Sequence, residues 1–201
     1  MRIAMLGGSF NPIHIGHCAL ADEVRLRLNY DKIIFVPAHI SPFKQDVKPA
    51  DDFHRIRMLK AVVRQNKAFD YDLCEIKRGG VSYTIDTLHY LTEKYSGKIE
   101  GRIGLIIGDD LVEGFDRWHN AEEISETADL ILARRHSEAG VDFAYPHKTV
   151  QNSIVTVSSS EIRQKIKSGE SFRYLVPFSV YRYITKRHLY EFDRQTDAGK
   201  D

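Results

Sequence analysis

The stretch that decides the fold is Gly7-Gly8-Ser9-Phe10-Asn11-Pro12-Ile13-His14-Ile15-Gly16-His17. An apolar run at residues 2–6 precedes it and predicts a buried strand. The paired glycines remove side chains where the backbone must turn, and Pro12 ends the turn. Apolar residues then recur every fourth position through residues 14–29, which predicts an amphipathic helix that begins near Ile15. A strand that turns directly into a helix is the first unit of an α/β fold.

The rest of the chain continues this alternation of strands and helices. Short β-type runs predict further strands at residues 32–36, 71–76, 102–107 and 128–133. Helical patterns predict helices at residues 51–66 and 82–95, a short one after Val157 and a last one at 177–190, with Ser82 or Thr84 capping the second. We therefore predict the α/β class: a doubly wound parallel sheet with helices on both faces and a small helical C-terminal part.

Length and composition indicate one folded domain. The 201 residues are 42% hydrophobic and 28% charged, which is typical of a single globular unit. We assign residues 1–192 to it and expect the polar residues 193–201 to fray. Two connections are longer than usual, at residues 37–50 and 136–151. We expect the first to be functional, because it follows a strand end where α/β sheets bind ligands, and the second to be a solvated flap.

The charge balance and the cysteine count exclude several classes of protein. The 29 basic and 28 acidic residues leave a formal charge of +1, which excludes a protein that coats nucleic acid through a strong positive field. No apolar run approaches the roughly 20 residues of a membrane span. Cys18 and Cys74 lie far apart without a CxxC pair, so no disulfide framework is expected. We expect a cytoplasmic protein with no nucleic-acid or membrane partner.

Residues 7–17 are suited to binding a phosphate. The two glycines let an anion approach backbone N–H groups, and the helix that follows directs the positive end of its dipole into the same space. His14 and His17 are three residues apart, so their side chains can project together, while Gly16 leaves the helix end bare. The combination predicts an anion cradle made of backbone, helix dipole and two imidazoles.

Each part of this cradle also has a simpler explanation. Paired glycines after a strand are often only a turn, and a histidine near a helix start is often a cap or a surface residue. Two histidines at this spacing can bind zinc, but no carboxylate or cysteine here completes a metal set, so we assign no metal ligands. The chain has neither GxxxxGKS/T nor GxGxxG, which removes the main support for kinase-like or hydride-transfer chemistry. The joint occurrence of the parts favours phosphate binding.

A second candidate cluster is Ser158-Ser159-Ser160-Glu161-Ile162-Arg163. Serines at a helix start offer hydroxyl and backbone N–H groups, and Arg163 lies one turn inside the helix. An isolated match of this kind is an ordinary serine cap with a solvated arginine. Beside the first cradle, it is a second place suited to a polyphosphate.

These motifs resemble those of the HxGH nucleotidyltransferase superfamily, which has a Rossmann-like nucleotidyltransferase fold. Further segments, in the same order along the chain, resemble the bacterial nicotinate mononucleotide adenylyltransferases. They are Phe53-His54-Arg55 with Met58-Leu59, Ser82-Tyr83-Thr84 with Asp86-Thr87, Gly108-Asp109-Asp110 followed by Trp118, and Leu175-Val176-Pro177 with Val180 and Tyr183-Ile184. The resemblance implies that the protein converts ATP and nicotinate mononucleotide to nicotinate adenine dinucleotide and pyrophosphate. It also implies that Mg²⁺ is the cofactor and binds together with ATP.

The resemblance also implies roles for individual residues. Three residues are expected to be catalytic: His14, His17 and Arg163. The residues expected at ATP are Gly7, Gly8, Ser9, Phe10, His14, His17, Gly108, Asp110, Ser158, Ser159 and Arg163. Those expected at the mononucleotide are Lys44, Thr84, Trp118 and His119. A core position is the alternative for the single tryptophan. No general base is needed, because a phosphate monoester with a second pKa of about 6 is already largely ionised at pH 7.

Three positions depart from the family pattern, and three questions stay open. Phe43 stands where many members have His, His119 where many have Tyr, and Ser160 where many have Thr. The first two lie on the mononucleotide side, so nicotinate and nicotinamide mononucleotide both remain candidates. Another acceptor such as phosphopantetheine, or a regulator without chemistry, is the alternative function. The C-terminal helix is either a free surface or the interface of a homo-oligomer.

Overall fold

The computed structural model describes residues 1–39, 51–134 and 142–191. Its centre is one six-stranded sheet in the order β3-β2-β1-β4-β5-β6, and every strand pair is parallel. The strands are β1 (Ile3–Gly8), β2 (Lys32–Pro37), β3 (Phe69–Tyr71), β4 (Ile103–Gly108), β5 (Ala128–Ala133) and β6 (His147–Val150). This order is that of a doubly wound sheet, so the predicted fold class is confirmed.

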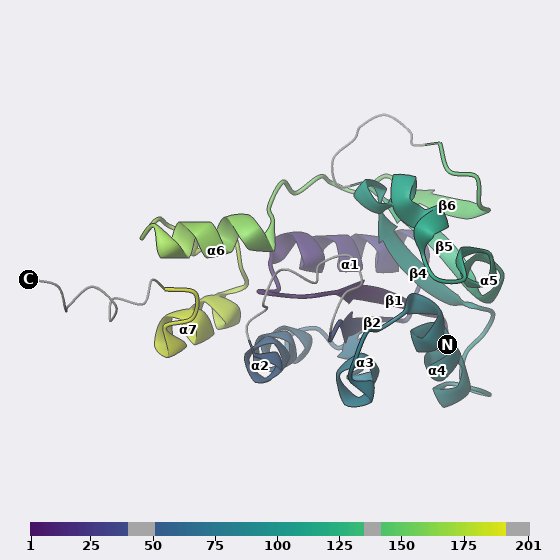
Figure 1. The fold of residues 1–201 in the computed structure, drawn as a ribbon, viewed down its shortest axis with the longest axis horizontal. Coiled ribbons are helices and arrows are strands. Elements are labelled where there is room, and N and C mark those ends of the chain that lie inside the picture. The colour runs from purple at the N-terminus through teal and green to yellow at the C-terminus, as the bar shows by residue number, and fades with distance from the viewer. Residues whose placement is uncertain (40–50, 135–141, 192–201) are drawn as a thin grey trace, which may run out of the picture.

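Helices cover both faces of the sheet (Figure 1). They are α1 (Ile15–Arg27), α2 (Asp52–Val63), α3 (Cys74–Arg78), α4 (Thr84–Lys94), the 3-10 helix η1 (Asp109–Arg117), α5 (Ala121–Thr127), α6 (Ser159–Lys167) and α7 (Phe178–Arg187). Alternate strand residues enter two separate cores, since Ala4 and Leu6 join the first and Ile3 and Met5 the second. Helices α1, α2, α6 and α7 pack on the first core, and α3, α4, η1 and α5 on the second.

The strand order creates a switch point between β1 and β4. The two strands are neighbours, but the chain continues from β1 to β2 on one side and from β4 to β5 on the other. Open α/β sheets bind ligands outside the carboxyl ends of the strands at such a point. The strands end here in Gly7-Gly8 and in Gly108, so the predicted phosphate-binding turn stands at the switch point. Figure 1 shows α6 and α7 together at the end of the molecule far from α5.

The predicted strand at residues 71–76 is wrong. Strand β3 ends at Tyr71, and α3 begins three residues later. The reason is the Asp72 side chain, whose Oδ1 accepts a hydrogen bond from the backbone N–H of Cys74 at 2.8 Å and starts a turn. Gly79, with φ of +70°, ends the helix.

Two further sequence expectations need correction. Helix α4 begins after Tyr83, without a side-chain cap, so neither Ser82 nor Thr84 has the predicted capping role. Ser82 is buried instead. The second long connection contains strand β6, which pairs with β5 at the edge of the sheet. Three of its four residues are exposed and polar or charged, so the sequence shows no apolar run there.

The other predicted strands and helices are present within a few residues of their expected bounds. Helices η1 and α5 were not predicted. Most of the first long connection, including Lys44, lies outside the described residues, as do residues 193–201. Among the described residues, no helix combines the length and apolar character needed to cross a membrane.

Candidate active site

The end of β1 and the turn that follows it, residues 7–12 and here called the glycine loop, face solvent at their start. Gly7 is exposed, and Gly8 and Ser9 are partly exposed. Phe10 has a left-handed φ of +46° and a fully buried ring, which packs edge-on against Phe35 at 5.7 Å between centroids. A Cβ on Gly8 would lie 3.1 Å from that ring, so the glycine makes room for the anchor of the loop.

His14 and His17 stand together at the start of α1, as the sequence predicted. Their rings are stacked with centroids 3.7 Å apart, and His14 is the residue before the helix. The backbone N–H of His14 donates to Nδ1 of His17 at 3.3 Å, which places the proton of a neutral His17 ring on Nε2. His14 is only 2% exposed, whereas His17 is half-buried. His17 is therefore the more accessible imidazole of the pair.

Gly16 allows the elements around these histidines to pack closely. A Cβ at this position would lie 3.2 Å from Cε1 and Nδ1 of His14 and 3.2 Å from Cγ1 of Val157. Such contacts are tighter than ordinary van der Waals contact. The sequence suggested that Gly16 keeps the helix end bare for a phosphate, and the structure adds a packing reason.

The serine cluster lies directly against the glycine loop. Ser159 Oγ donates to the backbone oxygen of Pro12 at 2.9 Å. Arg163 donates from Nη1 to the backbone oxygen of Asn11 at 2.8 Å and from Nη2 to Ser160 Oγ at 3.1 Å. Ser158 caps α6 by accepting the backbone N–H of Glu161 at 3.1 Å. Two motifs that are far apart in sequence therefore form one site.

Two residues without a predicted role also hold the glycine loop. Arg55 of α2 donates from Nη1 to the backbone oxygen of Ser9 at 2.6 Å, and Tyr190 donates from its hydroxyl to Asn11 Oδ1 at 2.8 Å. Burial raises the pKa of Tyr190, so its hydroxyl stays protonated as a donor. Arg55 lies on the same face of α2 as its buried apolar residues. An arginine on the apolar face of a predicted helix is a pattern that the sequence could have revealed. For Tyr190 no local pattern gives such a signal.

Acidic residues follow β4 at the other side of the switch point. Gly108 pairs with Ala133 at the end of its strand and directly precedes η1. Asp109 and Asp110 occupy the first turn of η1, and Asp110 is exposed. Of the predicted ATP residues, Gly108 is thus the last residue of the strand next to β1, and Asp110 lies just beyond its carboxyl end.

Three of the four predicted mononucleotide residues, Thr84, Trp118 and His119, come from two segments that touch each other. Thr84 opens α4, and the ring of the preceding Tyr83 lies 4.5 Å from the ring of His119. Trp118 is half-buried, with its ring 5.1 Å from that of Phe115 in the second core. The alternative that Trp118 is a core residue is therefore correct in part, because one side of its ring packs against the second core. Lys44 and Phe43 lie outside the described residues.

The site contains a thiol that is unsuited to be a nucleophile. Cys18 follows His17 in α1, and burial raises the pKa of its thiol to about 12. A thiol that stays protonated at neutral pH does not attack a phosphate ester. This agrees with its interpretation as a small helix residue.

No metal cluster accompanies the histidine pair in the described part of the chain. Residues 1–39, 51–134 and 142–191 contain no group of three or more His, Cys, Asp or Glu side chains that could hold a metal ion. A structural zinc site needs four ligands, so the zinc alternative for His14 and His17 has no support there.

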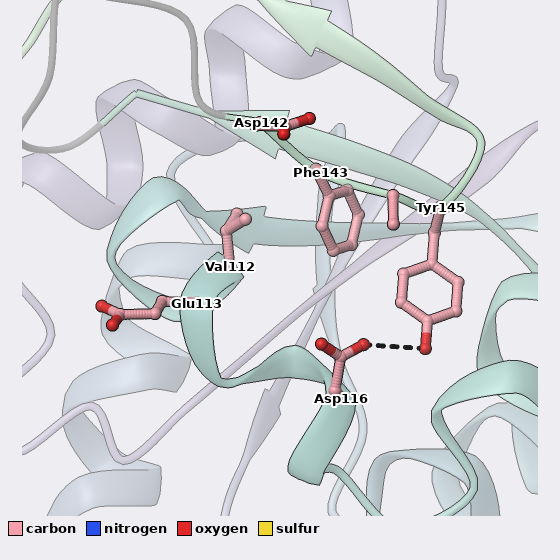
Figure 2. A pocket seen from close by; sticks show the side chains of 7 residues that line it. Val112, Glu113, Asp116, Asp142, Phe143 and Tyr145 are labelled. Atoms are coloured by element: carbon pink, nitrogen blue, oxygen red, sulfur yellow. Dashed lines mark hydrogen bonds between the residues drawn. The ribbon is translucent and has the colours of Figure 1, made fainter.

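A pocket between η1 and residues 142–145 is acidic. It is lined by Val112, Glu113, Asp116, Asp142, Phe143, Ala144 and Tyr145. Figure 2 shows the hydroxyl of Tyr145 directed at Asp116, to which it donates at 3.0 Å. Three carboxylates around one opening disfavour a polyphosphate. None of the predicted ATP residues lines this pocket.

The sequence matches one family model and is similar to curated proteins that share a name. Residues 5–165 match the family model described as cytidylyltransferase-like. A protein of Borrelia hermsii (strain HS1 / DAH), named "Probable nicotinate-nucleotide adenylyltransferase", is 43% identical over 94% of this chain and 98% of its own. A protein of Treponema pallidum (strain Nichols) with the same name is 36% identical over 94% of this chain and 99% of its own.

Solved structures share the fold at lower sequence identity. The Plasmodium falciparum nicotinic acid mononucleotide adenylyltransferase complexed with NaAD has a TM-score of 0.75 and 20% identity, covering 94% of this chain and 97% of that one. The structure described as "a Putative Nicotinate-nucleotide Adenylyltransferase from Vibrio parahaemolyticus" has a TM-score of 0.70 and 19% identity, covering 94% of this chain and 96% of that one. The chain belongs to the cytidylyltransferase-like family and, within it, to the nicotinate-nucleotide adenylyltransferases.

Proposed function

We propose that the protein transfers the adenylyl group of ATP to nicotinate mononucleotide in NAD biosynthesis. The names of relatives that cover nearly the whole chain support this reaction. The structural observation that carries it is the contact of Ser159 and Arg163 with the glycine loop. This contact makes one continuous basic and N–H-rich cradle beside the switch point, which is what a triphosphate requires.

The reaction forms one bond and breaks one. A phosphate oxygen of the mononucleotide attacks the α-phosphorus of ATP, and the bond from that phosphorus to the oxygen bridging to the β-phosphate breaks. Pyrophosphate leaves with the electron pair. The attacking oxygen is already ionised at neutral pH, so the protein has to position two anions and stabilise the charge that develops on the leaving group.

We assign the stabilisation of this charge to the cradle. His14, His17 and the start of α1 would bind the triphosphate, together with backbone N–H groups of Gly7, Gly8, Ser9 and Phe10. Ser158, Ser159 and Arg163 would hold the β- and γ-phosphates as they leave. Arg163 has five N–H donors, and the contacts with Asn11 and Ser160 use only part of them. Gly108 and Asp110 would lie beside the nucleotide.

We assign recognition of the mononucleotide to Thr84, Trp118, His119 and Lys44. Thr84 would contact the nicotinate carboxylate, Trp118 would stack on the pyridine ring, and Lys44 would approach the phosphate. The contact between the Tyr83 and His119 rings supports this assignment, because it joins the two described segments.

Mg²⁺ would enter the site together with ATP. The ion is usually held by substrate phosphates and one or two carboxylates rather than by a cage of protein ligands. The exposed Asp110 is a carboxylate of the required kind near the strand ends. Bound there, the ion would neutralise charge on the phosphates. We also place the enzyme in the cytoplasm, because both cysteines are free thiols, as expected in a reducing compartment.

An assay of pyrophosphate release tests the proposed function. The purified protein is incubated with MgATP and, in parallel, with nicotinate mononucleotide, nicotinamide mononucleotide or phosphopantetheine. We expect turnover with nicotinate mononucleotide. Turnover with phosphopantetheine alone would refute the acceptor, and ATP binding without release of pyrophosphate from any mixture would favour a regulator without chemistry.

A further inference from the structure

Arg55 is a fully buried cation beneath the proposed ATP site. It is 0% exposed, and its described partners are Asp52 on the same helix and the backbone oxygen of Ser9. Burying a guanidinium is costly unless it is paired and hydrogen-bonded, and an apolar side chain would usually pack there as well. The contact with the glycine loop therefore calls for a reason other than stability.

The bond from Arg55 fixes the direction of one peptide group. The Ser9 carbonyl and the Phe10 N–H belong to the same peptide, and this peptide is trans. In a trans peptide the carbonyl and the N–H point in opposite directions. When the carbonyl is held at 2.6 Å from Nη1 of Arg55, the Phe10 N–H points away from α2. The same bond turns a partial negative charge away from the phosphates.

The guanidinium is itself held in place from a second side. Asp52 accepts from Nη2 of Arg55 through Oδ1, and its other oxygen, Oδ2, lies 2.9 Å from Nδ1 of His39. His39 follows β2, and the neighbouring Ala38 donates its backbone N–H to the Gly8 oxygen at 2.9 Å. Asp52 therefore fixes the plane of the guanidinium relative to both the glycine loop and the end of β2.

We propose that Arg55 is a positioning residue for adenylyl transfer, which presents the Phe10 N–H to the phosphates of ATP by holding the Ser9 carbonyl, with Asp52 orienting its guanidinium. This inference rests on the proposed function. It predicts that a lysine is a poor replacement, because an ammonium keeps the charge but lacks the planar fork that reaches two acceptors in fixed directions.

The main test compares Arg55→Lys with Arg57→Lys on the same helix. Arg57 is exposed, and its described contact is with the ring of Phe53 on the same helix, so its variant should keep wild-type kinetics. Kinetics are measured well below the melting temperature of each protein and normalised to the folded fraction from circular dichroism. For Arg55→Lys we expect kcat/KM for ATP to fall by about tenfold to 10²-fold, with the KM for nicotinate mononucleotide changed by less than about twofold. Unchanged kcat/KM for ATP in the folded fraction would overturn the proposal.

A second measurement does not depend on turnover. In ¹⁵N-labelled wild-type protein, ATP added alone should shift the Phe10 amide resonance, and the shift should shrink in Arg55→Lys. An equal shift in both proteins would overturn the proposal, even if no acceptor reacted and the proposed function failed. Should Arg55→Lys not fold, Asp52→Asn takes its place, since Asp52 lies nearer the surface and the variant keeps the arginine while loosening its orientation.

Discussion

The backbone oxygen of Asn11 accepts a hydrogen bond from Nη1 of Arg163, at 2.8 Å and across 152 positions of the chain. The bond joins the turn after the first strand to a helix that follows the last strand. Because both partners belong to proposed phosphate-binding motifs, loss of the arginine removes a positive charge and also loosens the glycine loop.

Replacing Arg163 by alanine should therefore have a large effect on turnover. We expect kcat to fall by about 10² to 10³-fold, the range typical for the loss of a group that stabilises developing charge. Pyrophosphate release measures the effect. Lys167→Ala, at the exposed end of the same helix, is the matched control and should behave as wild type. Equal activity of the two variants would contradict the role of Arg163.

His17→Ala should separate transition-state stabilisation from binding. We expect turnover to fall by about 10²-fold or more while the affinity for ATP, from calorimetry, changes little. His89→Ala is the control, because His89 is an exposed histidine that pairs with Glu123 on the surface. A loss of ATP affinity as large as the loss of turnover would show that His17 acts in ground-state binding.

Gly16→Ala should impair activity, because Gly16 is packed between the His14 ring and Val157. The new methyl group meets the His14 ring and Val157 at 3.2 Å, so the imidazole or the segment before α6 must move by a few tenths of an ångström. We expect a fall in kcat of about tenfold with a small change in melting temperature, since displacements of this kind affect positioned groups most. Gly7→Ala, where a Cβ would meet nothing within 4 Å, tests whether bulk at the loop itself matters.

Gly104→Ala should destabilise the protein without a specific effect on the site. A Cβ there would lie 2.6 Å from the hydroxyl of Tyr30 and 2.8 Å from Cδ1 of Ile131, in the middle of the sheet. We expect a loss of about 1–3 kcal/mol in the free energy of unfolding by urea. The KM values for both substrates in the folded fraction should equal those of wild type, and a selective change in either would contradict this expectation.

The pH dependence of stability should report the Asp52 pair. Burial opposes ionisation of this carboxyl, but hydrogen bonds from Arg55 and His39 outweigh it and lower the pKa of Asp52. The pair therefore stabilises the fold above the unfolded pKa of about 3.9, and this contribution is lost as the pH falls through the lower folded value. Urea unfolding of wild type and Asp52→Asn should differ most near pH 7, and the difference should shrink below pH 4. A difference independent of pH would exclude this linkage.

The sequence predicted the parts of the structure that follow from local patterns. Strand β1, its glycine turn and helix α1 form a continuous local unit, so their order and the position of the histidine pair could be foreseen. Strand β6 could not, because an edge strand with exposed polar residues has no apolar run. Likewise, the turn at Asp72 depends on one side-chain bond that competes with a strand pattern.

Contacts between distant segments account for most of what sequence patterns did not predict in the site. Arg55 lies at a buried position of a helical pattern, which indicates that its charge must be paired inside the protein. The pattern does not identify the Ser9 carbonyl as the partner. Tyr190 meets Asn11 across 179 positions, a pairing that only the folded chain reveals.

The grip on the glycine loop has a consequence for synthesis on the ribosome. A nascent chain that ends at Val150 already carries all six strands, yet it lacks Ser159, Arg163 and Tyr190, the donors that hold Asn11 and Pro12. That chain also lacks α6 and α7, which pack on the first core, so one face of the sheet and the proposed nucleotide cradle are both incomplete. The C-terminal segment therefore has two tasks in the completed protein, since it covers the first core and supplies the side chains that hold the proposed nucleotide cradle.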